Sequence, residues 1–223
     1  MSFKLLLLIA LIITSCSDRK KELVEIRALP ILGHRDLEYK MVDGEEIVDT
    51  LYHIIPEFSY LNQDSVMISS KSIKGKIWIS DFFFTHCPSI CPPMTTQMKR
   101  LNFLLKDLSN EIEFLSFSID PDRDSPSRFR KYIEEHGIDA ENWNFFTGNE
   151  SATHILGVED FLVNARKDEK SPGGFAHSPG FTLVDREGRV RGVYIGTDTK
   201  EVDQLEKDVR KLLEIEYGGE SSK

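Results

Sequence analysis

Basic residues do not outnumber acidic ones in this sequence, and no cluster of them stands out. The 223 residues include 28 Lys and Arg against 37 Asp and Glu, which gives a net charge of -9 at pH 7. With no basic patch and no RNA-binding signature, nucleic acid is not expected as a partner. A long apolar run is missing too, because the run from Leu5 to Ile13 is too short to span a bilayer. Cysteine is scarce as well: there are only Cys16, Cys87 and Cys91.

The N-terminus has the features of an export signal. Lys4 precedes the apolar run, and Ile13-Thr14-Ser15-Cys16 ends it. An aliphatic residue, two small residues and a cysteine resemble a bacterial lipobox, in which the cysteine is lipidated and becomes the mature N-terminus. We therefore predict a lipoprotein signal peptide over residues 1–15, a lipid on Cys16, and an extracytoplasmic location on a bacterial membrane, facing the periplasm or the cell surface. The alternative is an ordinary signal peptide with an incidental cysteine.

Hydrophobic periodicity divides the rest of the chain into alternating strands and helices. Residues 16–50 are charged and weakly periodic, and they are predicted to be a membrane tether. The expected elements that follow are a hairpin over Ile54–Ser69, a strand over Ile77–Phe84, a helix beginning at Pro92, a strand over Ile112–Asp120, a helix over Pro126–His136, a short strand at 143–148, a helix at 151–162, a hairpin of residues 181–185 and 189–196, and a last helix capped by Asp198 and Glu201.

This order of elements predicts an α/β fold. Alternating strands and helices imply a thioredoxin-like three-layer sandwich with a central parallel pair, a closing antiparallel hairpin and an N-terminal β-hairpin extension. The domain is expected over residues 51–216, followed by a C-terminal tail over 217–223. No internal repeat or second domain is visible.

Two cysteines stand where a buried strand gives way to a helix, in the segment FFFTHCPSICPPMT. Cys87 and Cys91 are four residues apart, so both sulfurs can point to one spot, and a helix N-terminus lowers the pKa of a thiol. A disulfide between them would persist outside the cytoplasm, but closing so short a loop stabilises little. The pair is therefore a redox pair or half of a soft metal site.

The best third member of such a site is His177, in the segment SPGGFAHSPGFTLVD. In a thioredoxin-like sheet, the loop before the strand FTLVD faces the cysteine turn, which brings His177 near the sulfurs. Pro179 is predicted to be cis, because the loop must turn sharply to present this histidine. Asp120 ends a strand beside the cysteine loop and is expected to help position it.

The residues from about Ile54 to Leu213 resemble the Sco/SenC family of copper-binding proteins, which help to assemble cytochrome c oxidase. The matching pieces are FFFTHCPSICP, SIDPDRDSP and the single histidine before FTLVD. The resemblance implies a thioredoxin-like fold and implies that Cys87, Cys91 and His177 bind copper, as Cu(I) or Cu(II).

The sequence departs from the family pattern at two positions. Ala176 stands where an aspartate often precedes the ligand histidine, which removes a possible outer-shell carboxylate. His86 stands where an aromatic residue is common. We consider three roles for His86: an extra ligand, a neighbour that acidifies the thiols, or a surface residue.

Two functions are compatible with these residues. The first is a membrane-anchored metallochaperone, for which the resemblance implies a cytochrome c oxidase subunit or another copper or thiol carrier protein as partner. The second is an extracytoplasmic thiol–disulfide oxidoreductase that uses Cys87 and Cys91. The spacing C-x-x-x-C separates the sulfurs more than C-x-x-C does and favours the metal, and zinc is a weaker alternative to copper. Whether the chain is an enzyme is left open by the sequence.

Overall fold

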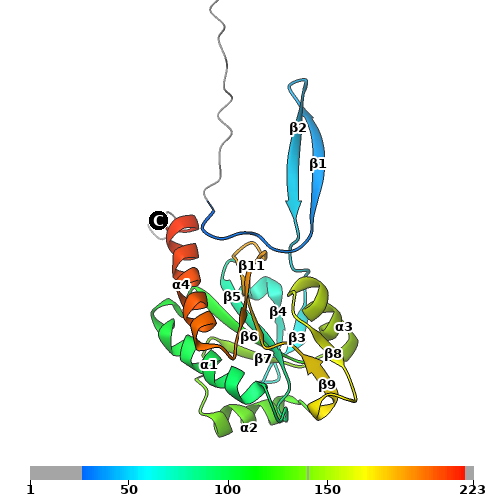
Figure 1. Cartoon of the computed structure of the whole chain (residues 1–223), viewed down its shortest axis with the longest axis vertical. Helices are drawn as coiled ribbons and strands as arrows, with labels where there is room; N and C mark the ends of the chain where they lie inside the picture. Colours follow the sequence, from blue (N-terminus) through cyan, green and yellow to red (C-terminus); the bar gives the residue numbers. More distant parts are fainter. Residues whose placement is uncertain (1–26, 140, 219–223) are drawn as a thin grey trace, which may run out of the picture.

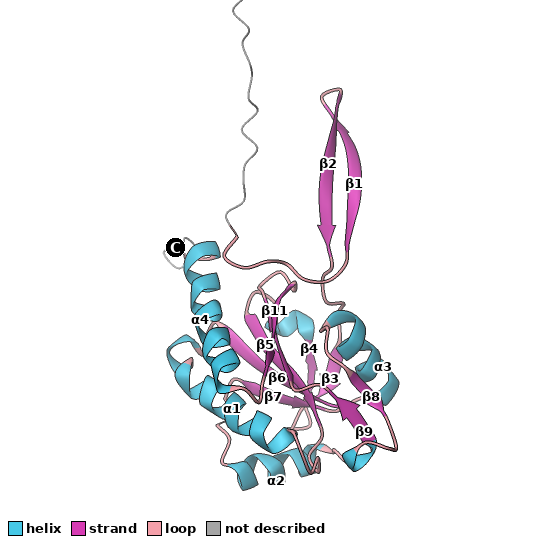
Figure 2. Ribbon diagram, viewed as in Figure 1, coloured by secondary structure: helices cyan, strands magenta, loops and turns pink. Residues whose placement is uncertain are grey.

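A five-stranded sheet forms the centre of the computed structural model, which describes residues 27–139 and 141–218 (Figures 1 and 2). In spatial order its strands are β11 (Val190–Ile195), β10 (Gly180–Val184), β5 (Ile77–Phe83), β6 (Ile112–Ser118) and β7 (Trp143–Phe146). Strands β5, β6 and β7 are parallel, whereas β10 is antiparallel to both β5 and β11. The predicted central parallel strands and closing hairpin are confirmed.

The central strands are buried over their whole length. All seven residues of β5 and all seven of β6 are buried, as expected for strands covered on both faces. Alternate side chains of β5 enter two different cores. The Phe82 ring stacks on Phe117 and meets Phe161, whereas the Phe83 ring packs on the other side against Phe129 and Phe145.

Helices and a small hairpin cover the two faces of the sheet. The Phe83 face carries α1 (Cys91–Leu104), α2 (Pro126–His136) and α4 (Thr199–Glu216). The other face carries β3 (Ser59–Leu61), β4 (Met67–Ser69), α3 (Glu150–Ile155) and a π-helical turn (Leu156–Asp160). Short elements complete the chain: 3-10 turns at Ser70–Ile73, Lys106–Leu108 and Pro172–Gly174, and the paired strands β8 (Ala165–Lys167) and β9 (Phe175–His177). These three layers are the sandwich that the sequence predicts.

Local capping residues explain where the helices begin and end. Ser125 accepts a hydrogen bond from the Arg128 amide at the start of α2, and Gly137 ends that helix in the left-handed conformation at φ 56°. Asp198 accepts a hydrogen bond from the Lys200 amide at the start of α4. Helix α1 begins at Cys91, one residue before the predicted start.

The N-terminal part has more structure than a tether. The signal peptide and residues 16–26, with Cys16, lie outside the described residues, but farther along β1 (Arg35–Val42) and β2 (Glu45–Tyr52) form an antiparallel hairpin. The Leu32 amide also donates a 2.8 Å hydrogen bond to the Val190 carbonyl. The predicted hairpin over Ile54–Ser69 is present as β3 and β4. None of the helices in residues 27–139 and 141–218 is long and apolar enough to cross a membrane.

Candidate metal centre

The two cysteines lie at the junction between β5 and α1. The Cys87 amide donates a 3.1 Å hydrogen bond to the Phe84 carbonyl, which turns the chain back after the strand. Cys91 is the first residue of α1, and the prolines behind it suit a first helical turn because they have no amide proton to leave unpaired. Both are buried, Cys87 at 7% exposed and Cys91 at 1%, so Cys87 is the nearer of the two to the surface. Both are free thiols.

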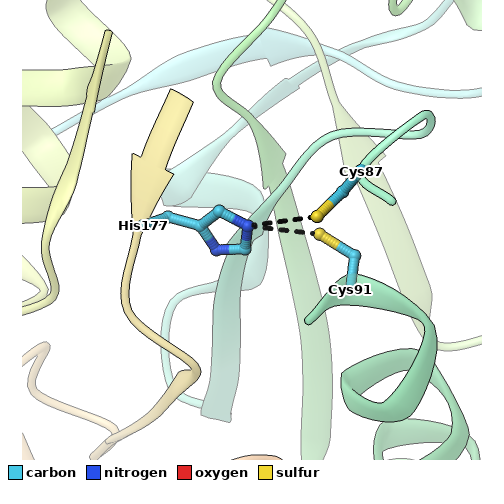
Figure 3. A group of neighbouring side chains, drawn as sticks. All are labelled: Cys87, Cys91 and His177. Atoms are coloured by element: carbon cyan, nitrogen blue, oxygen red, sulfur yellow. Dashed lines mark hydrogen bonds between the residues drawn. The ribbon is translucent and has the colours of Figure 1, made fainter. Parts of the chain in front are cut away.

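His177 completes a three-residue cluster, as the sequence predicts (Figure 3). Its Nε2 atom lies 3.3 Å from the Cys91 Sγ and 3.8 Å from the Cys87 Sγ. The three donor atoms all lie within 4.8 Å of one another. The histidine is brought in by β9, because the rings of Phe175 and of His177 itself both pack on Phe84, the residue that follows β5.

The prediction of a cis bond before Pro179 is wrong, because every peptide bond in the described part of the chain is trans. The structure presents His177 by strand pairing instead of a sharp turn. His177 pairs with Ala165 of β8. The next residue, Ser178, forms two hydrogen bonds with Asn164. The Ser178 amide donates to the Asn164 carbonyl at 2.9 Å, and the Asn164 amide donates to the Ser178 hydroxyl at 3.2 Å.

The two thiols have opposite acidities. A hydrogen bond from the Cys91 thiol, helped by His177 and opposed by burial, holds the pKa of Cys87 far below its ordinary value. The same hydrogen bond and burial raise the pKa of Cys91. Both shifts favour ionisation at the more exposed Cys87 over the deeper Cys91. The prediction that one thiol ionises easily is supported, with the neighbouring thiol as the main cause.

Within the described residues, the His177 ring nitrogen that points away from the sulfurs, Nδ1, lacks a hydrogen bond that would fix the orientation of the ring. The Nδ1 atom of His177 is buried and has no hydrogen-bond partner within residues 27–139 and 141–218. Ala176 offers no side-chain acceptor there, which fits the departure noted in the sequence. A buried carboxyl, Asp81, lies in the nearby core of β5; burial raises its pKa to about 6, against the effects of the Ser116 hydroxyl at 2.6 Å and of His177.

A buried aspartate holds the start of the cysteine loop. Asp124, which is fully buried, accepts the Thr85 amide at 3.0 Å, the Thr85 hydroxyl at 2.5 Å and the Ser118 hydroxyl at 2.6 Å. The Arg128 side chain adds a 3.0 Å hydrogen bond to the Thr85 hydroxyl. Sequence reasoning missed Asp124 and Thr85 as positioning residues. The available signal was the motif SIDPDRDSP, whose link to the cysteine loop only the fold reveals.

The loop after β6 that contains Asp124 also contacts the segment that leads to His177. Asp120 lies 3.3 Å from the His86 Nε2 and 2.5 Å from the Arg123 Nε. Arg123 also donates a 3.3 Å hydrogen bond to the Gly173 carbonyl, four residues before His177. The expected positioning role of Asp120 is therefore supported. His86 faces Asp120 and is not one of the three clustered donors.

The fold and these side chains define the class to which the protein belongs. It is a thioredoxin-like α/β protein with two cysteines and one histidine converging at the end of the central parallel strands. Residues 49–214 match the model of the SCO1/SenC family, and the chain belongs to this family.

Solved structures agree with this assignment. A SCO1/SenC family lipoprotein from Bacillus anthracis is 32% identical, with a TM-score of 0.66, covering 71% of this chain and 94% of that one. BsSco, a member of the Sco family of cytochrome c oxidase assembly proteins in which a disulfide switch was identified, is 32% identical, with a TM-score of 0.64, covering 72% and 93%. ScoI of Bradyrhizobium japonicum, solved with copper bound, is 23% identical, with a TM-score of 0.60, covering 72% and 100%. At 23% identity, the similarity to the Bradyrhizobium structure shows a shared fold.

Proposed function

We propose that the chain is a copper metallochaperone, held on a bacterial membrane by a lipid on Cys16, that assists copper-site assembly of cytochrome c oxidase. The observation that carries the proposal is the convergence of two sulfurs and one imidazole nitrogen within 4.8 Å. Family membership supports it, because BsSco belongs to a family of cytochrome c oxidase assembly proteins and the Bradyrhizobium ScoI structure holds copper.

The donor set fits copper on chemical grounds. Thiolate sulfurs suit Cu(I), and an imidazole nitrogen is a good donor to Cu(II). Cys87, Cys91 and His177 would together hold the ion as cargo. Three protein donors leave room for an incoming ligand, so an acceptor can bind the ion before the carrier releases it. The acceptor is expected to be a cytochrome c oxidase subunit or another copper or thiol carrier protein.

His177→Ala tests the metal site without removing the thiols. We expect Cu(I) affinity, measured anaerobically against a competing chelator, to fall by more than about 100-fold, since losing even an outer-shell partner costs about 10- to 100-fold. The loss should be larger for Cu(II), which favours nitrogen donors. His34→Ala is the matched control, because His34 is exposed and outside the cluster. Equal affinities of the two variants would contradict the proposal.

A thiol–disulfide oxidoreductase is the alternative, favoured by the low pKa of Cys87. The Cys87 thiolate would attack a substrate disulfide, forming a mixed disulfide and releasing one substrate thiolate. Cys91, after losing its proton, would then attack the Cys87 sulfur, forming the Cys87–Cys91 disulfide and releasing the second thiolate. Weak copper binding by the wild type, together with fast reduction of a model disulfide that depends on His177, would favour this alternative over the metallochaperone.

The lipid anchor is tested separately from the metal site. Cys16→Ala should leave the chain unprocessed or release it from the membrane, while copper affinity stays unchanged. Membrane fractionation and mass spectrometry of the N-terminus make the measurement. A wild-type chain that keeps residues 1–15 and carries no lipid would contradict this part of the proposal. The lipoprotein from Bacillus anthracis supports it by similarity.

A further inference from the structure

The hairpin of β1 and β2 stands away from the rest of the domain (Figure 1). Its strands pair with each other along all eight positions, and nearly all of their residues are exposed. A lone two-stranded hairpin is marginally stable in water, so this one needs a further surface to pack against. Most of it precedes residue 49, where the match to the family begins.

The two faces of the hairpin differ in character. On one face the residues Leu37, Tyr39, Met41 and Val48 are 57%, 62%, 69% and 52% exposed and lie in adjacent rows of the ladder. The other face also has apolar residues, Val42, Ile47 and Leu51, each 47% exposed, but it carries most of the hairpin's charge: Asp36, Glu38, Lys40, Glu45 and Asp49. We call the first of these the apolar hairpin face. It has the more exposed apolar side chains and the fewer charges, and an exposed apolar patch of this kind marks an interaction surface.

The apolar hairpin face has one charged residue of its own at each end, and the two charges are opposite; the Arg27 guanidinium, 4.6 Å from the Tyr52 ring centroid, adds to the positive end. Arg35 lies in the row at the base, paired with Tyr52, and Glu46 lies in the row next to the turn, paired with Met41. Neither Arg35 nor Glu46 forms an ion pair with the described part of the chain. A surface that is positive at one end, negative at the other and apolar between is complementary to itself when one copy is reversed.

We propose that the apolar hairpin face is the contact surface of an antiparallel dimer of this chain. With two copies packed face to face and reversed, Arg35 of each lies in the row that faces Glu46 of the other, and the apolar rows pack between them. A parallel arrangement would bring Arg35 to Arg35 and Glu46 to Glu46. A two-fold axis across the strands generates the antiparallel arrangement and satisfies both charges at once.

The size of the surface predicts a weak dimer. Burying the four apolar side chains of both copies removes on the order of 900 Å² from water, at the low end of specific interfaces. The dimer should therefore form reversibly in solution and more fully where lipid anchors confine two copies to one membrane, which raises their effective concentration. The net charge of -9 at pH 7 would repel an anionic lipid surface, which disfavours the bilayer as the occupant.

Charge exchange between the two ends tests the dimer. Sedimentation equilibrium of the full chain in mild detergent should show self-association that is at least tenfold weaker in Arg35→Glu and in Glu46→Arg. An equimolar mixture of these two single variants should recover the wild-type affinity, because both contacts then join opposite charges. The double variant carrying both changes should recover it as well. Asp36→Arg, on the opposite face, is the control and should leave association unchanged.

Other outcomes would overturn the proposal. A wild-type chain that stays monomeric at millimolar concentration, or variants that associate like the wild type, would show that this face does not join two copies. Binding to phosphatidylcholine vesicles that is lost in Tyr39→Ser, without any dimer, would assign the face to the membrane. Unchanged circular dichroism and copper affinity verify that the variants are folded, since the hairpin lies outside the metal cluster.

Discussion

Asp124→Ala should loosen the cysteine loop and destabilise the domain. Asp124 accepts three hydrogen bonds from Thr85 and Ser118, and it is fully buried. Thr85 stands two residues before Cys87 on the loop that leaves β5, so the carboxylate determines where that loop begins. The substitution removes all three acceptor contacts at once and leaves the polar groups of the loop and of β6 without this partner.

The expected magnitude follows from those contacts. Each buried donor left without an acceptor costs about 1–3 kcal/mol, which for one amide and two hydroxyls gives an upper limit of about 9 kcal/mol. Two terms reduce this cost. The hydroxyls of Thr85 and Ser118 can rotate toward other acceptors, and removing a desolvated carboxylate returns part of its burial penalty; burial also raises the pKa of Asp124. We therefore expect a net loss of about 3 kcal/mol in the free energy of unfolding, and about half of that for Asp124→Asn, whose amide oxygen still accepts from Thr85.

Urea unfolding followed by tryptophan fluorescence measures the stability, and competition with a chelator measures copper affinity on the same samples. Copper affinity should fall by about tenfold, the lower end of what outer-shell groups contribute. Asp122→Ala is the control, because Asp122 is exposed in the same loop and should change stability by less than about 0.5 kcal/mol. If Asp124→Ala and Asp122→Ala behaved alike in both assays, the positioning role of Asp124 would be refuted.

Two further predictions concern the buried charged groups Asp81 and Arg191. Burial raises the pKa of Asp81 to about 6, so the folded chain keeps a proton that the unfolded chain loses near pH 4, and the stability that this proton provides is lost as pH rises from about 4 to 6. In urea unfolding, Asp81→Asn should be as stable as the wild type below pH 4 and more stable by up to about 3 kcal/mol at pH 8. An unchanged difference between the two proteins across this pH range would refute the argument. Arg191 is fully buried and forms ion pairs with Asp185 and Glu216, so Arg191→Met should lower the free energy of unfolding by about 3 kcal/mol. The control Arg210→Met removes a more exposed ion pair and should cost at most about 1 kcal/mol; equal losses would contradict the argument.

Several elements were predictable because their signals are local. Ser125 and Gly137 cap α2 through contacts within a few residues, and the apolar run of β5 is buried at every position. The β1–β2 hairpin also had a local signal that sequence reasoning passed over. Asp43 and Gly44 form its two-residue turn with φ of 54° and 84°, the conformation for which Asp-Gly is favoured.

Contacts between distant residues separate what was predictable at the site from what was not. The sequence alone placed Cys87 and Cys91 together, because four residues across the start of a helix bring two side chains to one side. It brought His177 to them only through the expected strand order, and it assigned the wrong peptide geometry at Pro179 because the pairing of β8 with β9 leaves no pattern in so short a segment.

What only the tertiary structure decided are the contacts that join segments far apart in the chain. Asp124 reaches Thr85 across 39 residues, and the opposite pKa shifts of the two cysteines depend on the distance between their sulfurs and on how deeply each is buried. Composition and periodicity report which residues are apolar and which elements they form. They do not report which polar atoms meet once those elements pack, because hydrogen bonds and pKa values depend on interatomic distances and burial that exist only in the folded chain.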